Sequence, residues 1–135
     1  MIEIDRLGEN LSRIEDFKFN EIDQLQMCSY LNLHCNRLQH LQGFPYDRLC
    51  NLNELNLSSN DISLINLSEL SFLPSLKILD LSANKIQSLL DLPFLPGLEH
   101  LLVSYNMIES LIGLDENVPN LIRLDVSSSV KFDEQ

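Results

Sequence analysis

The segment Leu52-Asn-Glu-Leu55-Asn-Leu57-Ser-Ser-Asn60 decides the fold of this 135-residue chain. It places apolar residues at positions 52, 55 and 57, and an asparagine three residues later. Four further segments with the same apolar spacing begin at Cys28, Leu76, Leu98 and Leu121. Their third apolar residues stand at 33, 57, 81, 103 and 126, so the successive steps are 24, 24, 22 and 23 residues. Such regular self-similarity is the signature of a repeat architecture.

The alternation around Leu55-Asn-Leu57 has a period of two, which predicts a short strand with both leucines on one side. Strands from successive repeats would stack in parallel. Asn60 follows where the chain must leave the strand, and its amide can satisfy main-chain groups of the turn. The sequence therefore predicts a structural asparagine ladder, formed by Asn36, Asn60, Asn84 and Asn106.

The rest of each repeat predicts a short return segment. The apolar pairs that fit an inward-facing turn of helix are Leu38/Leu41, Ile62/Ile65, Ile86/Leu89 and Ile108/Leu111. Prolines at 74, 96 and 119 would end the helical segments, and Pro93 would shorten the third one to a 3₁₀ turn. We therefore expect an α/β solenoid with a parallel concave β-sheet and short helices or 3₁₀ turns on the convex side.

The chain divides into three parts. Residues 1–27 are expected to cap the array, with a strand at Ile2–Ile4 and then a helix or irregular turns. Leu7, Leu11 and Ile14 fit one helix face, whereas Phe17 and Phe19 alternate. Residues 28–130 hold about five repeats, and residues 131–135 form a polar tail. Too few residues follow the last repeat for a full cap beyond Phe132. A natural short end and a truncated array both remain open.

Composition excludes several classes of partner. The 20 Asp and Glu against 9 Lys and Arg give a net charge of −11, which disfavours direct binding of nucleic acid or of an anionic membrane. The three cysteines show no paired pattern, and neither a signal peptide nor an 18-residue apolar run is present. These features favour a reducing, intracellular location. The protein is expected to be monomeric.

The repeat resembles the leucine-rich repeat family, in the 22-residue type found in the protein phosphatase-1 regulatory subunit. Tyr30-Leu-Asn-Leu-His-Cys-Asn36, with Leu57-Ser-Ser-Asn60, resembles the leucine-rich repeat and coiled-coil centrosomal proteins. Val103-Ser-Tyr-Asn106-Met-Ile-Glu-Ser-Leu111 resembles that family and also the leucine-rich light chain of axonemal dynein. The resemblance implies a place in a centrosomal, basal-body or axonemal assembly. It does not extend to a coiled coil, which this chain lacks.

The outward positions of the strands predict the binding surface. If Leu55 and Leu57 point inward, their neighbours lie on the concave face. Ile78 and Leu102 are apolar where a solvated strand would be polar, and a polar and aromatic rim around an apolar centre is typical of protein interfaces. The residues expected to contact a partner are Tyr30, Asn32, His34, Glu54, Asn56, Ile78, Asp80, His100, Leu102, Tyr105, Arg123 and Asp125.

Catalytic and metal chemistry finds little support in the sequence. His34 and Cys35 are neighbours, so a strand end would point them to different sides. Cys28 takes an apolar repeat position, and no Cys or His spacing matches a zinc site. The sequence predicts no enzyme, no cofactor and no metal.

Three functions fit a non-catalytic interaction module. The first is partner binding in a centrosomal, basal-body or axonemal assembly, with a cytoplasmic location. The second is a regulatory subunit of a serine/threonine phosphatase, against which the short array counts. The third is an adaptor similar to the spliceosomal A-prime subunit, which holds an RNA-binding protein and implies a nuclear location.

Overall fold

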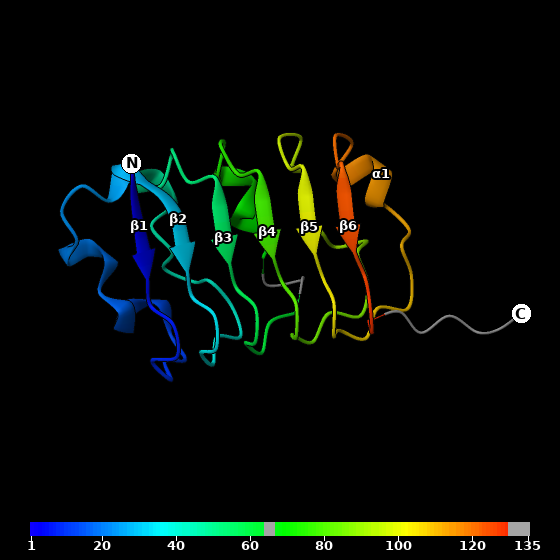
Figure 1. Cartoon of the computed structure of the whole chain (residues 1–135), viewed down its shortest axis with the longest axis horizontal. Coiled ribbons are helices and arrows are strands. Elements are labelled where there is room, and N and C mark those ends of the chain that lie inside the picture. The colour runs from blue at the N-terminus through cyan, green and yellow to red at the C-terminus, as the bar shows by residue number, and fades with distance from the viewer. Residues whose placement is uncertain (64–66, 130–135) are drawn as a thin grey trace, which may run out of the picture.

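Six short parallel strands stand side by side in the computed structural model, which describes residues 1–63 and 67–129 (Figure 1). They follow the order of the chain, so each strand pairs with the next one in sequence. Their bounds are Ile2–Asp5 (β1), Cys28–Asn32 (β2), Glu54–Asn56 (β3), Ile78–Asp80 (β4), His100–Leu102 (β5) and Arg123–Asp125 (β6). The strand predicted near Ile2 is therefore present and begins the sheet.

The register of the sheet stacks equivalent residues of successive repeats. From β2 to β6 the central leucines pair in turn, and they are Leu31, Leu55, Leu79, Leu101 and Leu124. The first four are completely buried, whereas Leu124 on the last strand is half-buried. Between β1 and β2 the register shifts once, at Ile2 and Glu3. One continuous apolar core thus runs behind the sheet.

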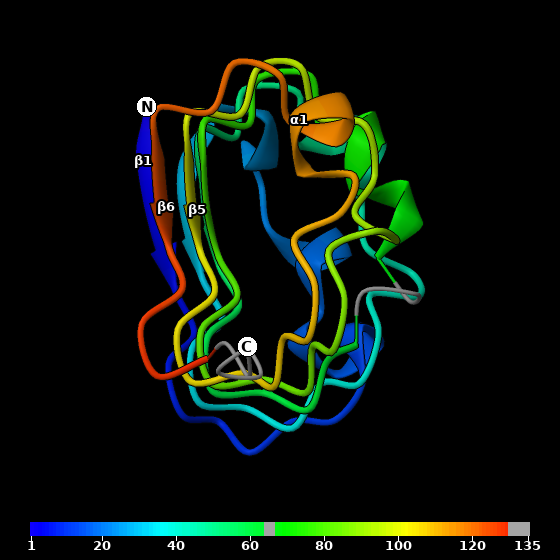
Figure 2. The ribbon, with the colours of Figure 1, turned by 90° about the vertical axis from the view of Figure 1, so that its right-hand side faces the viewer.

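The return segments lie across the core from the sheet, as the end-on view shows (Figure 2). Their helices are Ile14–Phe17 (η1), Phe19–Glu21 (η2), Leu25–Met27 (η3), Tyr46–Arg48 (η4), Ser68–Phe72 (η6) and Leu114–Asn117 (α1). No helix in residues 1–63 and 67–129 is long and apolar enough to cross a membrane. The predicted fold class, a parallel sheet with short helices or 3₁₀ turns opposite it, is confirmed.

The helical turns predicted directly after the ladder asparagines are wrong. Leu38, Leu41, Ile86 and Leu89 are buried as expected, but they lie in extended or bent chain. One of these segments forms an isolated parallel bridge with the next repeat, between Ser88 and Ser110. In each described repeat, extended chain leads away from the turn after the strand. The described helices lie farther along, on the side of the core opposite the sheet (Figure 2). Ile65 lies outside the described residues.

The 3₁₀ turn predicted near Pro93 is also wrong, because the chain between β4 and β5 contains no helix. Pro93 and Pro96 both lack the N–H group that a helical turn would need. The prolines at 74 and 119 behave as predicted: η6 has its C-cap at Leu73 and α1 has its C-cap at Val118.

After β1 the N-terminal segment forms turns and the short 3₁₀ helices η1 to η3, so of the two expected alternatives the irregular turns are present and the helix face of Leu7, Leu11 and Ile14 is not. Leu7 is 52% exposed, because the chain turns after β1 at Gly8, which has a positive φ of 64°. Ile14 and Phe17 reach the core from η1 instead. The polar tail 131–135 and Phe132 lie outside the described residues.

Candidate functional site

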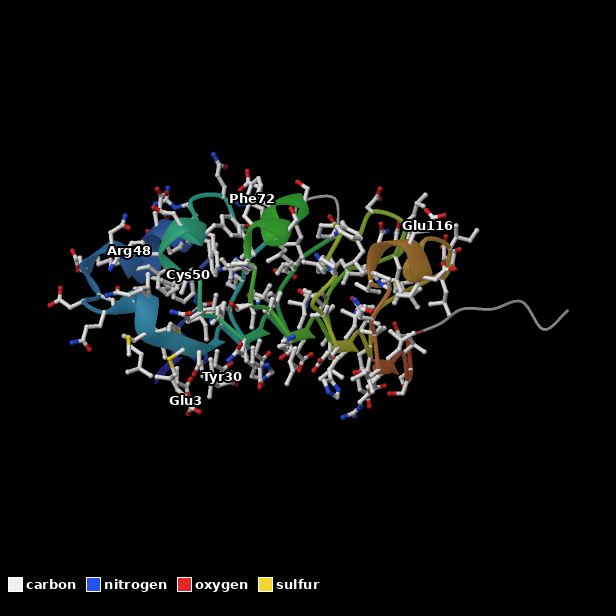
Figure 3. The ribbon with its side chains drawn as sticks, turned by 90° about the horizontal axis from the view of Figure 1, so that it is seen from above. Glu3, Tyr30, Arg48, Cys50, Phe72 and Glu116 are labelled. Atoms are coloured by element: carbon white, nitrogen blue, oxygen red, sulfur yellow. The ribbon has the colours of Figure 1, made fainter. Side chains whose placement is uncertain are left out.

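Two rows of side chains cross all six strands on the solvent side of the sheet, which we call the sheet face. The first row consists of Glu3, Tyr30, Glu54, Ile78, His100 and Arg123. The second row consists of Asp5, Asn32, Asn56, Asp80, Leu102 and Asp125. Figure 3 shows Glu3 and Tyr30 on this side of the molecule, and Phe72 and Glu116 on the opposite side. The sheet face thus gathers ten predicted contact residues, and β1 adds Glu3 and Asp5.

The second row has a local role that sequence analysis missed. Oδ1 of Asn32 accepts a hydrogen bond from the main-chain N–H of His34 at 2.9 Å, and Oδ1 of Asp80 accepts one from Ser82 at 3.0 Å. The same bond to the residue two positions ahead is made by Asp5, Asn56 and Asp125. Short polar side chains satisfy in this way the first N–H of the turn. Their oxygens therefore hold the strand ends in place.

Leu102 is the exception in this row. It is the second-row residue of β5, and its side chain has no oxygen that could accept a hydrogen bond from Ser104. Leu102 is half-buried on a surface where every other strand of the sheet carries Asp or Asn. The turn after β5 forms without this side-chain bond. The turn bond made by the other second-row residues therefore does not account for an apolar residue at this position.

Ile78 and Leu102 form one diagonal of a square of side chains. Ile78 pairs with His100 across β4 and β5, and Asp80 pairs with Leu102. The other diagonal joins Asp80 and His100. Parallel strands lie about 4.8 Å apart and alternate residues about 6.6 Å apart, so the four side chains are neighbours. The square presents two aliphatic side chains between a carboxylate and an imidazole.

The sheet face is strongly acidic beside this square. Glu3, Asp5, Glu54 and Asp80 lie on β1, β3 and β4, and none of them forms an ion pair with a described residue. Partial burial raises the pKa of Glu54, and the nearby carboxylates of Asp80 and Glu3 raise that pKa further. The charge on this half of the surface is therefore negative and uncompensated.

The C-terminal half of the sheet face is closer to neutral. Arg123 and Asp125 lie on the same strand, β6, with Nη2 of the arginine 4.0 Å from Oδ2 of the aspartate. The pKa of Asp125 is lowered, mainly because its carboxylate accepts hydrogen bonds from the main-chain N–H and the hydroxyl of Ser127. The asymmetry gives the surface an acidic end and a balanced end.

Two predicted contact residues lie in the turns beyond the strands. Tyr105 is 68% exposed and has a positive φ of 55°. It belongs to a column of left-handed residues that precede the ladder, formed by Cys35, Ser59, Ala83, Tyr105 and Ser128. His34 follows β2, and its Nδ1 lies 2.5 Å from Oγ of Ser58. Tyr105 thus borders the sheet face and is not part of its rows.

The His34–Ser58 contact brings an imidazole and a hydroxyl together, yet its hydrogen bonds are unsuited to nucleophilic catalysis. Oγ of Ser58 donates to Oδ1 of Asn56 at 2.6 Å, so the proton between Ser58 and His34 must come from Nδ1 of the imidazole. A histidine that donates to the serine cannot take its proton. Ser58 is also buried. The pair therefore braces two turns.

The four ladder asparagines are buried and bridge successive coils. Nδ2 of Asn84 donates to the main-chain oxygens of Leu57, one coil earlier, and of Leu81, in its own coil, both at 3.0 Å. Oδ1 of Asn84 accepts from the N–H of Ile62 at 2.9 Å. Asn36, Asn60 and Asn106 make equivalent bonds. The predicted ladder asparagines thus join the main chains of neighbouring coils, and they do not lie on the sheet face.

Comparisons with known proteins agree with this geometry. A family model described as Leucine rich repeat matches residues 29–86. A solved internalin from Listeria monocytogenes superposes on 93% of this chain with a TM-score of 0.56 and 20% sequence identity, and the match covers 40% of the internalin. The structural match extends over nearly the whole solenoid, and the family match covers its middle part. The chain has the leucine-rich repeat fold.

Two curated relatives, both receptors by name, match parts of the chain. The chain is 34% identical over 82 residues to leucine-rich repeat-containing G-protein coupled receptor 5 of Rattus norvegicus, and 41% identical over 58 residues to Toll-like receptor 9 of Mus musculus. These matches cover 56% and 43% of this chain, but 9% and 5% of the receptors. The chain therefore spans a small part of the length of either relative.

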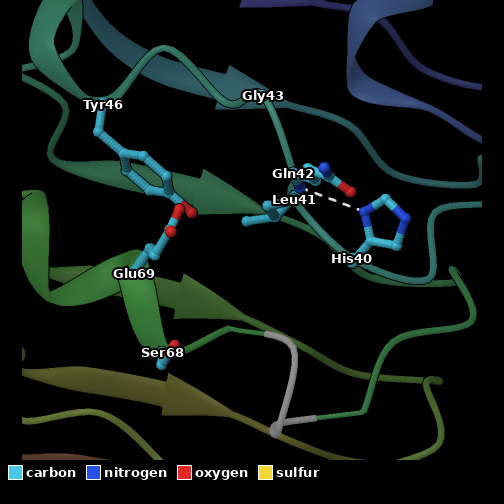
Figure 4. Close-up of a pocket in the computed structure, with 7 residues that line it drawn as sticks. All are labelled: His40, Leu41, Gln42, Gly43, Tyr46, Ser68 and Glu69. Atoms are coloured by element: carbon cyan, nitrogen blue, oxygen red, sulfur yellow. Dashed lines mark hydrogen bonds between the residues drawn. The ribbon is translucent and has the colours of Figure 1, made fainter.

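A pocket on the far side of this leucine-rich repeat solenoid was not anticipated. It has a volume of about 390 Å³ and lies between the loop at His40–Gly43 and η6, with Tyr46 and Glu69 facing one another (Figure 4). Burial, and then the charge of Glu69, raise the pKa of Tyr46, so the phenol stays neutral at physiological pH. Nδ1 of His40 accepts a hydrogen bond from the N–H of Gln42 at 3.2 Å.

The cysteines do not assemble into a site. Cys28 is buried, and desolvation raises the pKa of its thiol, as expected of a small core residue. Cys35 and Cys50 are exposed and unpaired by disulfides. No group of three or more His, Cys, Asp or Glu side chains suited to a metal ion occurs in the part of the chain that the structure describes.

An aromatic row across the first three coils was also missed. The rings follow one another with centroid distances of 5.1 to 6.2 Å, in the order Phe17, Phe19, Phe44, Tyr46 and Phe72. Their sequence spacing is irregular, so no periodic pattern marks them. The row packs the convex side of the N-terminal coils.

Proposed function

We propose that this chain is a non-catalytic module that binds a partner protein through its sheet face. Proteins with leucine-rich repeats generally act as protein–protein interaction modules. The observation that carries the proposal is Leu102, which lies diagonally across from Ile78 at a second-row position where the other strands carry a hydrogen-bonding Asp or Asn. Half-buried aliphatic side chains with a polar rim are suited to a desolvated contact.

The assembly in which the module works is a further part of the proposal. The likeness of Tyr30–Asn36 to centrosomal repeat proteins supports a centrosomal, basal-body or axonemal partner, and with it a cytoplasmic location and a monomeric state. A phosphatase catalytic subunit and an RNA-binding protein are the alternative partners. The net charge of −11 supports contact with a protein over direct contact with nucleic acid.

The experiment is a capture of partners by the tagged chain, compared with the double variant Ile78→Asp/Leu102→Asp. Ile112 and Leu90 are exposed outside the sheet, so Leu90→Asp/Ile112→Asp is a control with the same change in charge and hydrophobicity. Circular dichroism checks that all three proteins are folded. We expect a partner that is lost only with the sheet-face variant, and its identity distinguishes the three assemblies. Equal capture by both variants would contradict a sheet-face site.

A further inference from the structure

We infer that the sheet face binds a basic, amphipathic α-helix of a partner protein, with one apolar side chain seated between Ile78 and Leu102. This inference rests on the proposed function and specifies the chemistry of the partner. It combines three observations on the same surface. They are an apolar anchor, an uncompensated acidic flank and a width that fits one helix.

The anchor is the diagonal of Ile78 and Leu102. The two residues lie on adjacent strands, β4 and β5, two positions out of register, and Asp80 and His100 complete the square around them. An apolar side chain placed at the centre of the square contacts both aliphatic groups. The surrounding polar groups remain at the rim, as in most protein interfaces.

The charge identifies the partner as basic. The carboxylates of Glu3, Asp5, Glu54 and Asp80 flank the anchor on the β1 side and have no cationic partner among the described residues. Burial first, and then repulsion from Asp80 and Glu3, raises the pKa of Glu54, and a cation that approaches relieves this repulsion. An acidic or second identical chain would add to this repulsion, whereas Lys and Arg side chains complement it.

The dimensions fit a helix that crosses the strands. Strands β3 to β6 have three residues each, so the sheet face is about 10 Å wide, close to the diameter of one α-helix. The apolar side chain of the partner sits midway between β4 and β5, so the strand of Glu54 is about 7 Å from it and that of Glu3 about 17 Å. A helix rises about 1.5 Å per residue, so basic residues about five and about eleven positions from this apolar residue reach the two carboxylates.

The test is selection from a displayed library of helical peptides on the immobilised full-length chain. Selected peptides are then measured by fluorescence anisotropy against the parent protein and three double variants. Ile78→Asp/Leu102→Asp removes the anchor and Glu3→Lys/Glu54→Lys reverses the flank. Glu109→Lys/Glu116→Lys changes the net charge equally at two exposed residues that are not on the sheet face.

We expect the selected helices to be rich in Lys and Arg around one large apolar residue. Their affinity should fall at least about tenfold with either sheet-face variant, and stay within about twofold with the control variant. Their affinity should also fall with rising salt concentration.

The other outcomes separate the two proposals. Neutral or acidic helices that lose binding with Ile78→Asp/Leu102→Asp would overturn the basic partner and leave the sheet-face function standing. Helices that bind Ile78→Asp/Leu102→Asp with the same affinity as the parent would contradict both proposals. A failure to select any helix would overturn the helical partner. A dimer of the parent chain in sedimentation, dissociated by the same variant, would identify a second copy as the occupant and overturn the inference.

Discussion

Nδ2 of Asn60 donates a hydrogen bond to the main-chain oxygen of Leu33 at 3.0 Å, across 27 residues of sequence. The same amide donates to Leu57 in its own coil, also at 3.0 Å, and Oδ1 of Asn60 accepts from the N–H of Leu38 at 2.9 Å. One buried side chain thus satisfies main-chain groups of two coils. This bond forms only when the second coil returns in register with the first.

Replacing Asn60 should destabilise the chain through these unpaired groups. We expect Asn60→Ala to lower the free energy of unfolding by about 1–3 kcal/mol, because the buried carbonyls and N–H lose their partner. Asn53→Ala is the control, since Asn53 is exposed and outside the ladder, and it should cost less than about 0.5 kcal/mol. Chemical denaturation measures both, and equal midpoints for the two variants would refute the role of the ladder.

Leu102→Asn should weaken partner binding without destabilising the fold. The new amide can accept the turn bond from Ser104 that the other second-row residues make, so we expect the free energy of unfolding to stay within about 1 kcal/mol of the parent. Partner binding should fall at least about tenfold, because the anchor is lost. A stable variant with parental affinity would show that Leu102 is not part of the interface.

The neighbouring substitution Leu101→Asn is the matched contrast. Leu101 is completely buried behind β5, so a polar amide there should cost about 3 kcal/mol or more. Thermal unfolding compares the two variants directly. If Leu102→Asn is as destabilising as Leu101→Asn, the side chain of Leu102 stabilises the fold. The proposal that Leu102 contributes to binding and little to stability would then be wrong.

The pH dependence of stability should reveal the acidic flank. The pKa of Glu54 is raised in the folded chain, by burial first and then by Asp80 and Glu3, so folding favours its protonated form. Its contribution to stability is present at pH below its unfolded pKa and is lost as the pH rises through the folded pKa. Glu54→Gln should therefore raise the melting temperature at about pH 7 and have little effect at about pH 3.

Denaturation of parent and Glu54→Gln at several pH values measures this difference. Asp47→Asn is a suitable control, because Asp47 lies in η4, away from the sheet face, and is exposed. A gain in stability that is equal at low and neutral pH would show that the carboxylate charge of Glu54 is not the cause.

The sequence predicts the strands, because their apolar residues recur at the same spacing in every repeat. Leu55 and Leu57 alternate with polar residues, and each repeat copies them, so the strands, their parallel order and the buried face follow from spacing alone. The outward position of the ten predicted contact residues on the strands follows for the same reason, since the neighbours of inward leucines must point outward. Tyr105 could not be placed this way, because its left-handed backbone turns it out of the strand pattern.

The parts that sequence analysis missed depend on contacts between coils. The apolar pair Ile86 and Leu89 has helical spacing, yet the bridge between Ser88 and Ser110 holds that segment extended. The turn bonds of Asn32 and Asp80 could have been predicted, because Asp and Asn favour such turns. The outward position of these residues suggested partner contacts instead. The His34–Ser58 contact spans 24 residues and becomes visible only once the coils are stacked.

The aromatic row supplies the last prediction, because it joins the first three coils on the convex side. Phe44 is buried between Phe19, at a centroid distance of 6.0 Å, and Tyr46, at 5.1 Å. Phe44→Ala should therefore lower the free energy of unfolding by about 3–5 kcal/mol, through lost burial and an unfilled cavity. Phe72, at the end of the row, is 64% exposed and contacts Tyr46 alone in the row, so Phe72→Ala should cost about 1 kcal/mol or less. Chemical denaturation measures the free energy of unfolding of both variants. A larger loss from Phe72→Ala than from Phe44→Ala would show that the exposed end of the row contributes more to stability than its buried centre.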